Sequence, residues 1–340
     1  MSQRDVVRSV LRSYGASLAD ERIESLGSAG GFSGARFWRL TTDSGTLCLR
    51  RWPQGHPSPP RLLFIHQTLR HVAERAELPL ASPRYTDEGL TFLSMAGHLW
   101  QLEPWLPGVA DYRQRPSDRR LVAAMEMLAT FHRAAASHSE TAGRRGPPPA
   151  VADRLKRIAH WTPQRLADLG ERTAADADPR LAAIAERAAP LVMLYRQAAP
   201  GVESELRQIA DVELPLAPCL RDIHDEHVLF VDEAVSGVID FGALRVDHTA
   251  IDVARLLGSL AGDDEDRWRR GCDVYDTSRG DLAPLDRPRV RLLDRATTLL
   301  SGLNWLEWVF TAGRQFEDYD VITERLRRIE RRLRVAAEAC

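Results

Sequence analysis

Lysine is almost absent from this chain, because only Lys156 among its 46 basic residues is a lysine. Any phosphate contact that other proteins make through lysine must therefore be made here by arginine, whose planar guanidinium binds anions through paired donors. The formal net charge is only −2. This balance gives no electrostatic reason to expect a nucleic acid or an acidic membrane surface as a partner.

Cysteines and long apolar runs are also scarce. The four cysteines, Cys48, Cys219, Cys272 and Cys340, are too scattered for a zinc pattern and do not resemble a disulfide framework. No run approaches the ~18 apolar residues of a membrane span, and the first residues carry charges where a signal peptide needs an apolar core. We expect a cytoplasmic protein in a reducing compartment, where ATP is also available.

The length and the order of patterns predict two lobes. A chain of 340 residues with 44% hydrophobic residues exceeds the size at which one core usually stops growing, about 250 to 300 residues. Residues 3–14 have the pattern of a short amphipathic helix. Three strand-like segments follow at 23–26, 35–41 and 46–51, and they predict an antiparallel meander. Two prolines and a glycine in 102–108 indicate a hinge, beyond which the pattern is helical. We predict a nucleotide-binding lobe at 1–103 and a catalytic and substrate lobe at 104–340.

A glycine-rich link joins the first two strand-like segments. It has four glycines in the eight residues 27–34, which lets backbone amides approach a bound phosphate. A flexible hairpin loop explains the same composition. The candidate phosphate-contacting positions are Gly30, Gly31 and Ser33. Arg50 follows on the third segment and alternates in direction with Arg51, so only one of the two points inward. A solvated edge arginine is the other interpretation.

The central stretch 219–242 carries the most informative pattern. The apolar run 228–231 has strand composition, 232–236 is polar enough to turn, and 237–239 forms a second strand. In an antiparallel hairpin, the residues before the first strand and after the second lie at the same end. We therefore expect Asp222, His227 and Asp240 to come together. A surface hairpin with ordinary acidic flanks is the alternative.

Phosphoryl transfer needs such a set of residues. One carboxylate orients the acceptor hydroxyl and takes its proton, while separate ligands hold the metal that bridges the phosphates. The segment Leu220-Arg-Asp222-Ile-His224-Asp-Glu-His227-Val-Leu-Phe230 looks like a His-Gly-Asp-Leu-His-x-x-Asn-Val-Leu-Phe catalytic loop. It is followed by Gly237-Val-Ile-Asp240-Phe-Gly242, and then by Asp247 and Asp252. With these motifs the chain resembles the aminoglycoside phosphotransferase-like kinases.

That resemblance implies an α+β, two-lobed protein-kinase-like fold, with an N-terminal antiparallel sheet lobe and a larger, mainly helical C-terminal lobe. It also implies ATP with magnesium, or manganese, as cofactors. Asp222 would be the catalytic base and Asp240 the main metal ligand, with His227 as the second ligand. Arg50 would contact phosphate, and Glu103 would lie in the adenine-binding hinge.

Three positions depart from the family pattern. Leu220-Arg221 replaces His-Gly, His227 replaces a metal-binding asparagine, and His66 stands where a glutamate would pair with the phosphate-binding cation. An imidazole suits manganese better than magnesium. Lipopolysaccharide core sugar kinases look similar here, with Arg-Asp followed by a histidine five residues after the aspartate.

Three functions remain as candidates. The first is an ATP-dependent phosphotransferase acting on a hydroxyl of a small metabolite, sugar or aminoglycoside-like compound. The second is a weak or inactive pseudokinase that binds nucleotide or acts as a scaffold, and the third is an envelope saccharide kinase. Acidic clusters at 262–266 and 317–320 could attract a cationic substrate or form solvated faces. The sequence identifies neither the acceptor nor the oligomeric state.

Overall fold

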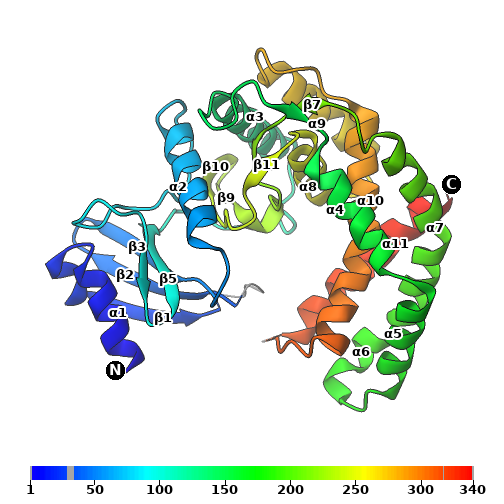
Figure 1. Cartoon of the computed structure of the whole chain (residues 1–340), viewed down its shortest axis with the longest axis horizontal. Coiled ribbons are helices and arrows are strands. Elements are labelled where there is room, and N and C mark those ends of the chain that lie inside the picture. Colours follow the sequence, from blue (N-terminus) through cyan, green and yellow to red (C-terminus); the bar gives the residue numbers. More distant parts are fainter. Residues whose placement is uncertain (1, 29–33, 317, 339–340) are drawn as a thin grey trace. The chain divides into compact units, whose positions relative to one another are not determined.

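The computed structural model describes residues 2–28, 34–316 and 318–338 (Figure 1). It divides into two compact units, here called the first unit (Met1–His138 with Asp225–Arg245) and the second unit (Ser139–His224 with Val246–Cys340). The two-lobe boundary expected at residue 103 stays a prediction.

The first unit holds the sheet. Its helices and strands are α1 (Gln3–Arg12), β1 (Arg22–Gly27), β2 (Arg36–Thr42), β3 (Gly45–Arg51), α2 (Pro59–Ala73), β4 (Leu93–Met95), β5 (His98–Pro104), α3 (Asp118–Ala135), β9 (Val228–Val231) and β10 (Ala234–Val238), with 3-10 turns at Ala16–Ala19 and Asp225–His227. The five-stranded sheet has the order β1-β2-β3-β5-β4, and all its neighbours pair antiparallel. The antiparallel meander that the sequence predicts is confirmed.

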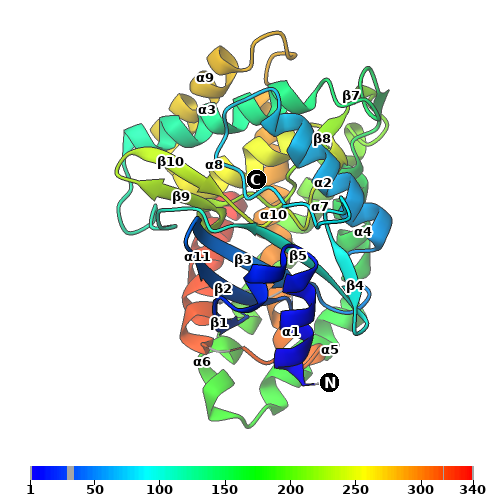
Figure 2. The ribbon, with the colours of Figure 1, turned by 90° about the vertical axis from the view of Figure 1, so that its left-hand side faces the viewer.

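The two faces of this sheet differ in chemistry because side chains alternate along each strand. One face carries an apolar cluster to which β2, β3 and β5 contribute, and α1 covers it with Val6, Val7, Val10 and Leu11 (Figure 2). A capping box between Ser2 and Asp5 begins α1. The opposite face carries polar side chains, and Arg50, Gln101 and Glu103 are all buried there.

Backbone hydrogen bonds attach the β9–β10 hairpin to the rest of the first unit. Phe230 N donates to Val109 O at 2.9 Å, and Val238 N donates to Pro79 O at 2.8 Å. The predicted turn at 232–236 is too long, because β10 already begins at Ala234, and the irregularity between Val235 and Gly237 is a bulge inside the ladder. Polar composition alone therefore misplaced the start of the second strand.

The second unit is mainly helical. Its elements are β6 (Arg145–Gly146), α4 (Pro149–His160), α5 (Pro163–Ala175), α6 (Ala182–Ala185), α7 (Ala188–Gln208), β7 (Leu214–Pro215), β8 (Ala217–Cys219), α8 (Ala250–Ala261), α9 (Glu265–Ser278), α10 (Arg287–Leu306) and α11 (Tyr319–Glu338), with a 3-10 turn at Pro179–Leu181 and a π-helical turn at Glu307–Thr311. β11 (Arg245–Asp247) starts at the unit boundary and pairs with β8. Gly258 lets α8 approach α10 closely, because a Cβ there would collide with the Asp294 carboxylate.

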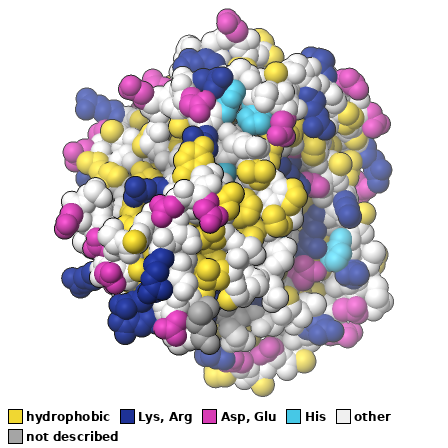
Figure 3. Space-filling model, turned by 60° about the vertical axis from the view of Figure 1, so that its left-hand side comes forward, with side chains coloured by type: hydrophobic (Ala, Val, Ile, Leu, Met, Phe, Trp, Pro, Cys, Tyr) yellow, Lys and Arg dark blue, Asp and Glu magenta, His cyan; other side chains and the backbone are white. Residues whose placement is uncertain are grey.

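Among the helices that the structure describes, none is both long and apolar enough to cross a membrane. On the face drawn in Figure 3, basic and acidic side chains are interspersed and do not separate into patches of one sign. Ion pairs between surface side chains include Arg207–Glu203 at 2.5 Å and Arg287–Asp273 at 2.6 Å. An exposed pair of this kind contributes little to stability, about 0 to 1 kcal/mol.

Candidate active site

The hairpin brings two of the predicted site residues together in the first unit. His227 precedes β9 and Asp240 follows β10, and Ile239 N donates to His227 O at 3.1 Å, which closes this end of the ladder. The His227 Nε2 atom lies 3.8 Å from Asp240 Oδ2. Asp222 belongs to the second unit, and its place beside this pair stays a prediction.

Asp240 is held as a carboxylate. Burial alone would raise its pKa, but the charges of Arg50 and His227, together with hydrogen bonds from Arg50 and the Gly242 backbone, outweigh burial and lower it. The Arg50 Nη2 atom donates to Asp240 Oδ1 at 2.9 Å. The backbone of Asp240 has φ of 60°, a left-handed conformation that costs a non-glycine residue about 1 to 3 kcal/mol and often occurs at functional sites.

Arg50 is the inward-pointing member of the Arg50–Arg51 pair. Its side chain is only 4% exposed, and its guanidinium lies 3.6 Å from the centre of the Trp52 ring. This stacking and the bond to Asp240 fix the direction of a cation that would otherwise be mobile. Its contact with phosphate stays a prediction, because Gly30, Gly31 and Ser33 lie outside the described residues.

A buried polar network lies on the same sheet face as Arg50. Gln101 Oε1 accepts from Trp52 Nε1 at 2.7 Å and bonds His66 Nε2 at 3.1 Å, while Gln101 Nε2 donates to Glu103 Oε2 at 2.5 Å. His66 Nδ1 lies 2.9 Å from Thr91 Oγ1. Burial lowers the pKa of His66 to about 4. Neither the neutral nor the protonated imidazole carries negative charge, so His66 cannot replace the expected glutamate as a counter-ion.

Glu103 lies on the same face of the sheet as Arg50 and Gln101. Burial raises its pKa to about 7, and Asp240 adds to the rise, whereas Arg50 and the Gln101 hydrogen bond act in the opposite direction. The Glu103 side chain is buried, and its backbone pairs with Cys48 in the sheet. The adenine-binding role of the segment around Glu103 stays a prediction.

In the second unit, the predicted base Asp222 is bound by an arginine that sequence reasoning missed. Arg255 on α8 donates to Asp222 Oδ1 from Nε at 3.1 Å and from Nη2 at 2.9 Å. The Asp222 side chain is half exposed, so its carboxylate also meets solvent. Asp222 and Arg255 are 33 positions apart in the sequence, and no local sequence pattern predicts a contact between them.

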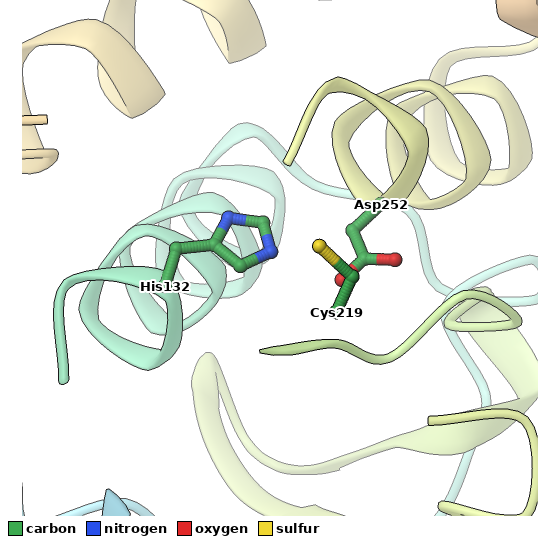
Figure 4. A group of neighbouring side chains, drawn as sticks. All are labelled: His132, Cys219 and Asp252. Carbon is green, nitrogen blue, oxygen red and sulfur yellow. The ribbon is translucent and has the colours of Figure 1, made fainter. Parts of the chain in front are cut away.

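Asp252 binds the backbone of the two residues that precede Asp222. Its two carboxylate oxygens accept from Leu220 N and Arg221 N, each at 2.6 Å. Figure 4 shows Asp252 beside Cys219, whose thiol donates to Asp247 O at 3.4 Å; His132, also drawn there, comes from α3 of the first unit. The spacing from Asp222 to Asp252 was part of the sequence resemblance, but this role was not predicted.

Arg221 occupies the place where the family pattern has glycine. Its backbone φ is 69°, in the left-handed region that glycine adopts without strain. Its guanidinium forms ion pairs with Asp153, at 2.6 Å, and with the fully buried Asp247. These pairs hold a non-glycine residue in a strained position directly before Asp222.

Known proteins with similar sequences identify the family of this chain. Residues 27–293 match the model of the phosphotransferase enzyme family. The chain belongs to this family. It is 34% identical over 125 residues to a homoserine kinase of Granulibacter bethesdensis, covering 33% of this chain and 39% of that protein. It is 27% identical over 227 residues to a homoserine kinase of Rhodospirillum rubrum, covering 65% and 59%. The chain thus spans less than two thirds of either curated relative.

Solved structures agree on the fold. An amicoumacin kinase in complex with AMP-PNP and Ca²⁺ has a TM-score of 0.61 at 14% identity, covering 97% of this chain and 93% of that one. An aminoglycoside phosphotransferase from Alicyclobacillus acidocaldarius has a TM-score of 0.56 at 16% identity, covering 98% and 96%. The predicted α+β, protein-kinase-like fold is confirmed.

Proposed function

We propose that this protein is an ATP-dependent phosphotransferase that transfers the γ-phosphate to a hydroxyl of a small molecule in the cytoplasm. The arrangement of Arg50, Asp240 and His227 carries the proposal. It combines an oriented cation with a carboxylate of lowered pKa and an imidazole at the end of the hairpin. Membership of the phosphotransferase enzyme family supports the reaction class.

The donor set at the hairpin fits the metal ion that accompanies ATP. The 3.8 Å between His227 Nε2 and Asp240 Oδ2 is less than twice a metal–ligand bond of about 2.1 Å, so both atoms can bind one ion. Two protein ligands suffice for a nucleotide-bound ion, because phosphate oxygens and water complete its shell. When bound, the metal would neutralise the charge that develops on the phosphates.

Residues of the chain supply the remaining roles. Arg50 donates hydrogen bonds to phosphate oxygens from a fixed direction, and its charge keeps Asp240 ionised. Asp222 accepts the proton of the acceptor hydroxyl, for which it must be unprotonated. Asp252 and Arg221 act on the backbone that presents Asp222.

ATP turnover against a panel of acceptors tests the proposal. The panel contains L-homoserine, glucose, spectinomycin and a lipid-linked saccharide, which examines the envelope alternative. We expect wild-type turnover with at least one acceptor, and a loss of about 100-fold or more in Asp222→Asn. Turnover that persists unchanged in Asp222→Asn would refute the role of Asp222, and turnover with no acceptor would refute the phosphotransferase assignment.

The metal site has its own test. His227→Asn replaces an imidazole nitrogen by an amide oxygen, so the activity ratio with magnesium over manganese should rise. An unaltered ratio contradicts ligation by His227. Thermal-shift titration with ATP and each metal provides a second readout that does not require an acceptor.

Two observations favour the pseudokinase alternative. An ion pair with Arg255 already occupies the carboxylate of Asp222, and the uncharged His66 stands where the family pattern has a glutamate. A nucleotide-dependent thermal shift without turnover on any acceptor would support a nucleotide-binding scaffold.

A further inference from the structure

The ring of Trp52 is the nearest aromatic contact of Arg50 among the residues that the structure describes. The guanidinium carbon of Arg50 lies 3.6 Å from the centre of the Trp52 ring and 5.3 Å from that of the Phe37 ring. Among the same residues, only Asp240 forms an ion pair with Arg50, and the buried Nε of Arg50 has no hydrogen-bond partner. An aromatic face within about 6 Å attracts a cation. The Trp52 ring is therefore a second restraint on this guanidinium.

Trp52 is itself fixed inside the first unit. It is 3% exposed, and its backbone N donates to Leu99 O at 2.8 Å. The indole Nε1, the only polar atom of the side chain, donates to Gln101 Oε1 at 2.7 Å. A buried ring whose single donor is bonded has little freedom to rotate, so Trp52 presents a constant face to Arg50.

A chain of hydrogen bonds orients the partner of Trp52. Gln101 Nε2 donates to Glu103 Oε2 at 2.5 Å, which turns Gln101 Oε1 toward Trp52 and His66. An amide oxygen only accepts, so His66 Nε2, at 3.1 Å, is the protonated ring nitrogen. His66 Nδ1 then accepts from Thr91 Oγ1 at 2.9 Å. His66 therefore supports Trp52 through Gln101, although it offers Arg50 no negative charge.

Trp52 also packs against the backbone that follows Asp240. A Cβ at Gly242 would lie 3.1 Å from two atoms of the Trp52 ring, Cζ3 and Cη2, so the absence of a side chain lets the ring approach closely. A backbone hydrogen bond from Gly242 helps to lower the pKa of Asp240. One ring thus packs against both the cation and the segment that holds its carboxylate partner.

An aromatic ring restrains a guanidinium without neutralising it. A second carboxylate at this place would cancel charge that Arg50 offers to phosphate oxygens, whereas the ring carries no net charge. Asp240 is also the proposed metal ligand, but the contact between Trp52 and Arg50 does not involve its carboxylate. The restraint by the ring is therefore independent of the metal ion.

We propose that Trp52, held by Gln101, is the positioning residue that orients Arg50 for the nucleotide phosphates. Trp52 acts through Arg50 and touches no reacting atom itself. The inference rests on the proposed function, because it takes Arg50 as the group that contacts phosphate.

A double-mutant cycle, measured by calorimetric titration of the full chain with ATP and magnesium, tests the proposal. Arg50→Met should weaken ATP binding by about 10- to 100-fold, because a charge-assisted contact is lost. Trp52→Leu should weaken it by about 3- to 30-fold, the range of a buried cation–π contact. In the Arg50→Met background, Trp52→Leu should change the affinity less than about twofold, because its partner is already gone. Trp52→Phe keeps an aromatic face and should lose less than Trp52→Leu.

Trp100→Leu is the matched control on the same sheet. Trp100 is 1% exposed, its Nε1 donates to Met95 O at 3.0 Å, and the Arg51 guanidinium lies 5.9 Å from its ring. It belongs to the apolar cluster on the opposite face, so its replacement should leave ATP affinity within about twofold of wild type. Circular dichroism establishes that each variant is folded. Phenylalanine variants replace the leucine variants, and Arg50→Gln replaces Arg50→Met, where the first choice is not folded.

Adenosine is a second readout, because it lacks the phosphates that Arg50 would contact. Trp52→Leu should leave adenosine affinity within about twofold of wild type, since a positioning role through Arg50 concerns only the phosphates. Additive losses in the cycle, or an unchanged ATP affinity in Trp52→Leu, overturn the proposal. So does an equal loss for ATP and adenosine, or a loss of ATP affinity in Trp100→Leu as large as that in Trp52→Leu.

Turnover separates this inference from the proposed function. Phosphorylation of an acceptor by the wild type, together with additive losses in the cycle, overturns the role of Trp52 and leaves the kinase in place. ATP binding that follows the expected cycle, without turnover on any acceptor, removes the kinase and leaves the role of Trp52 in nucleotide binding. Wild-type protein that binds no ATP overturns both.

Discussion

Replacing Glu103 with glutamine should stabilise the protein above pH 7 and leave it nearly unchanged near pH 4.5. The pKa of this buried carboxyl rises from 4.5 to about 7, with burial as the largest cause. At about 1.4 kcal/mol per pKa unit, the ionised form costs the folded protein roughly 3 kcal/mol. The folded state therefore binds the proton more tightly than the unfolded chain, and this contribution to stability is lost as the pH rises from about 4.5 through 7.

Glutamine resembles the protonated carboxyl and can still accept the hydrogen bond from Gln101 Nε2. Urea unfolding of wild type and Glu103→Gln at pH 5 and pH 8, followed by tryptophan fluorescence, measures the difference. We expect the gain of the variant to grow by about 2 to 3 kcal/mol between these pH values. Glu24→Gln, at an exposed position on β1, is the control. Equal pH dependence in wild type and Glu103→Gln would refute the reasoning.

Two further predictions concern the backbone before Asp222. Asp252→Asn removes the charge from an acceptor of two backbone hydrogen bonds, and should lower the free energy of unfolding by about 2 to 4 kcal/mol in urea titration; a loss below about 1 kcal/mol contradicts this. Arg221→Ala leaves the buried Asp247 without its cation and should cost about 3 to 5 kcal/mol. Arg221→Gly should cost about 1 kcal/mol less, because glycine tolerates φ of 69°, and identical losses would exclude backbone strain.

Local patterns predicted the first unit well. The strand-like segments match β1, β2 and β3 to within a residue or so. Ser117 caps α3, because its Oγ accepts from Arg120 N. The predicted start of the second strand, at residue 237, was wrong, because β10 begins at Ala234. Ala234 and Val235 follow two acidic residues, yet they belong to the ladder because their backbone groups pair with Val231 and Phe230 of β9.

The site was predictable only where the chain itself connects its parts. His227 and Asp240 flank one hairpin, so their approach follows from antiparallel pairing. The contact of Arg255 with Asp222 and the network around Gln101 depend on side chains from distant segments that meet only after packing. Periodicity and turn signals carry no information on such contacts.

The presence of an arginine instead of a lysine at position 50 also affects how this protein can be detected. Nucleotide probes that acylate an amine beside the phosphates depend on a lysine, and a guanidinium stays protonated and does not react in that way. The only lysine, Lys156, is exposed on α4. If nucleotide binds at Arg50 as we propose, surveys of ATP-binding proteins by lysine labelling would pass over this protein, and arginine-directed dicarbonyl reagents would suit it better.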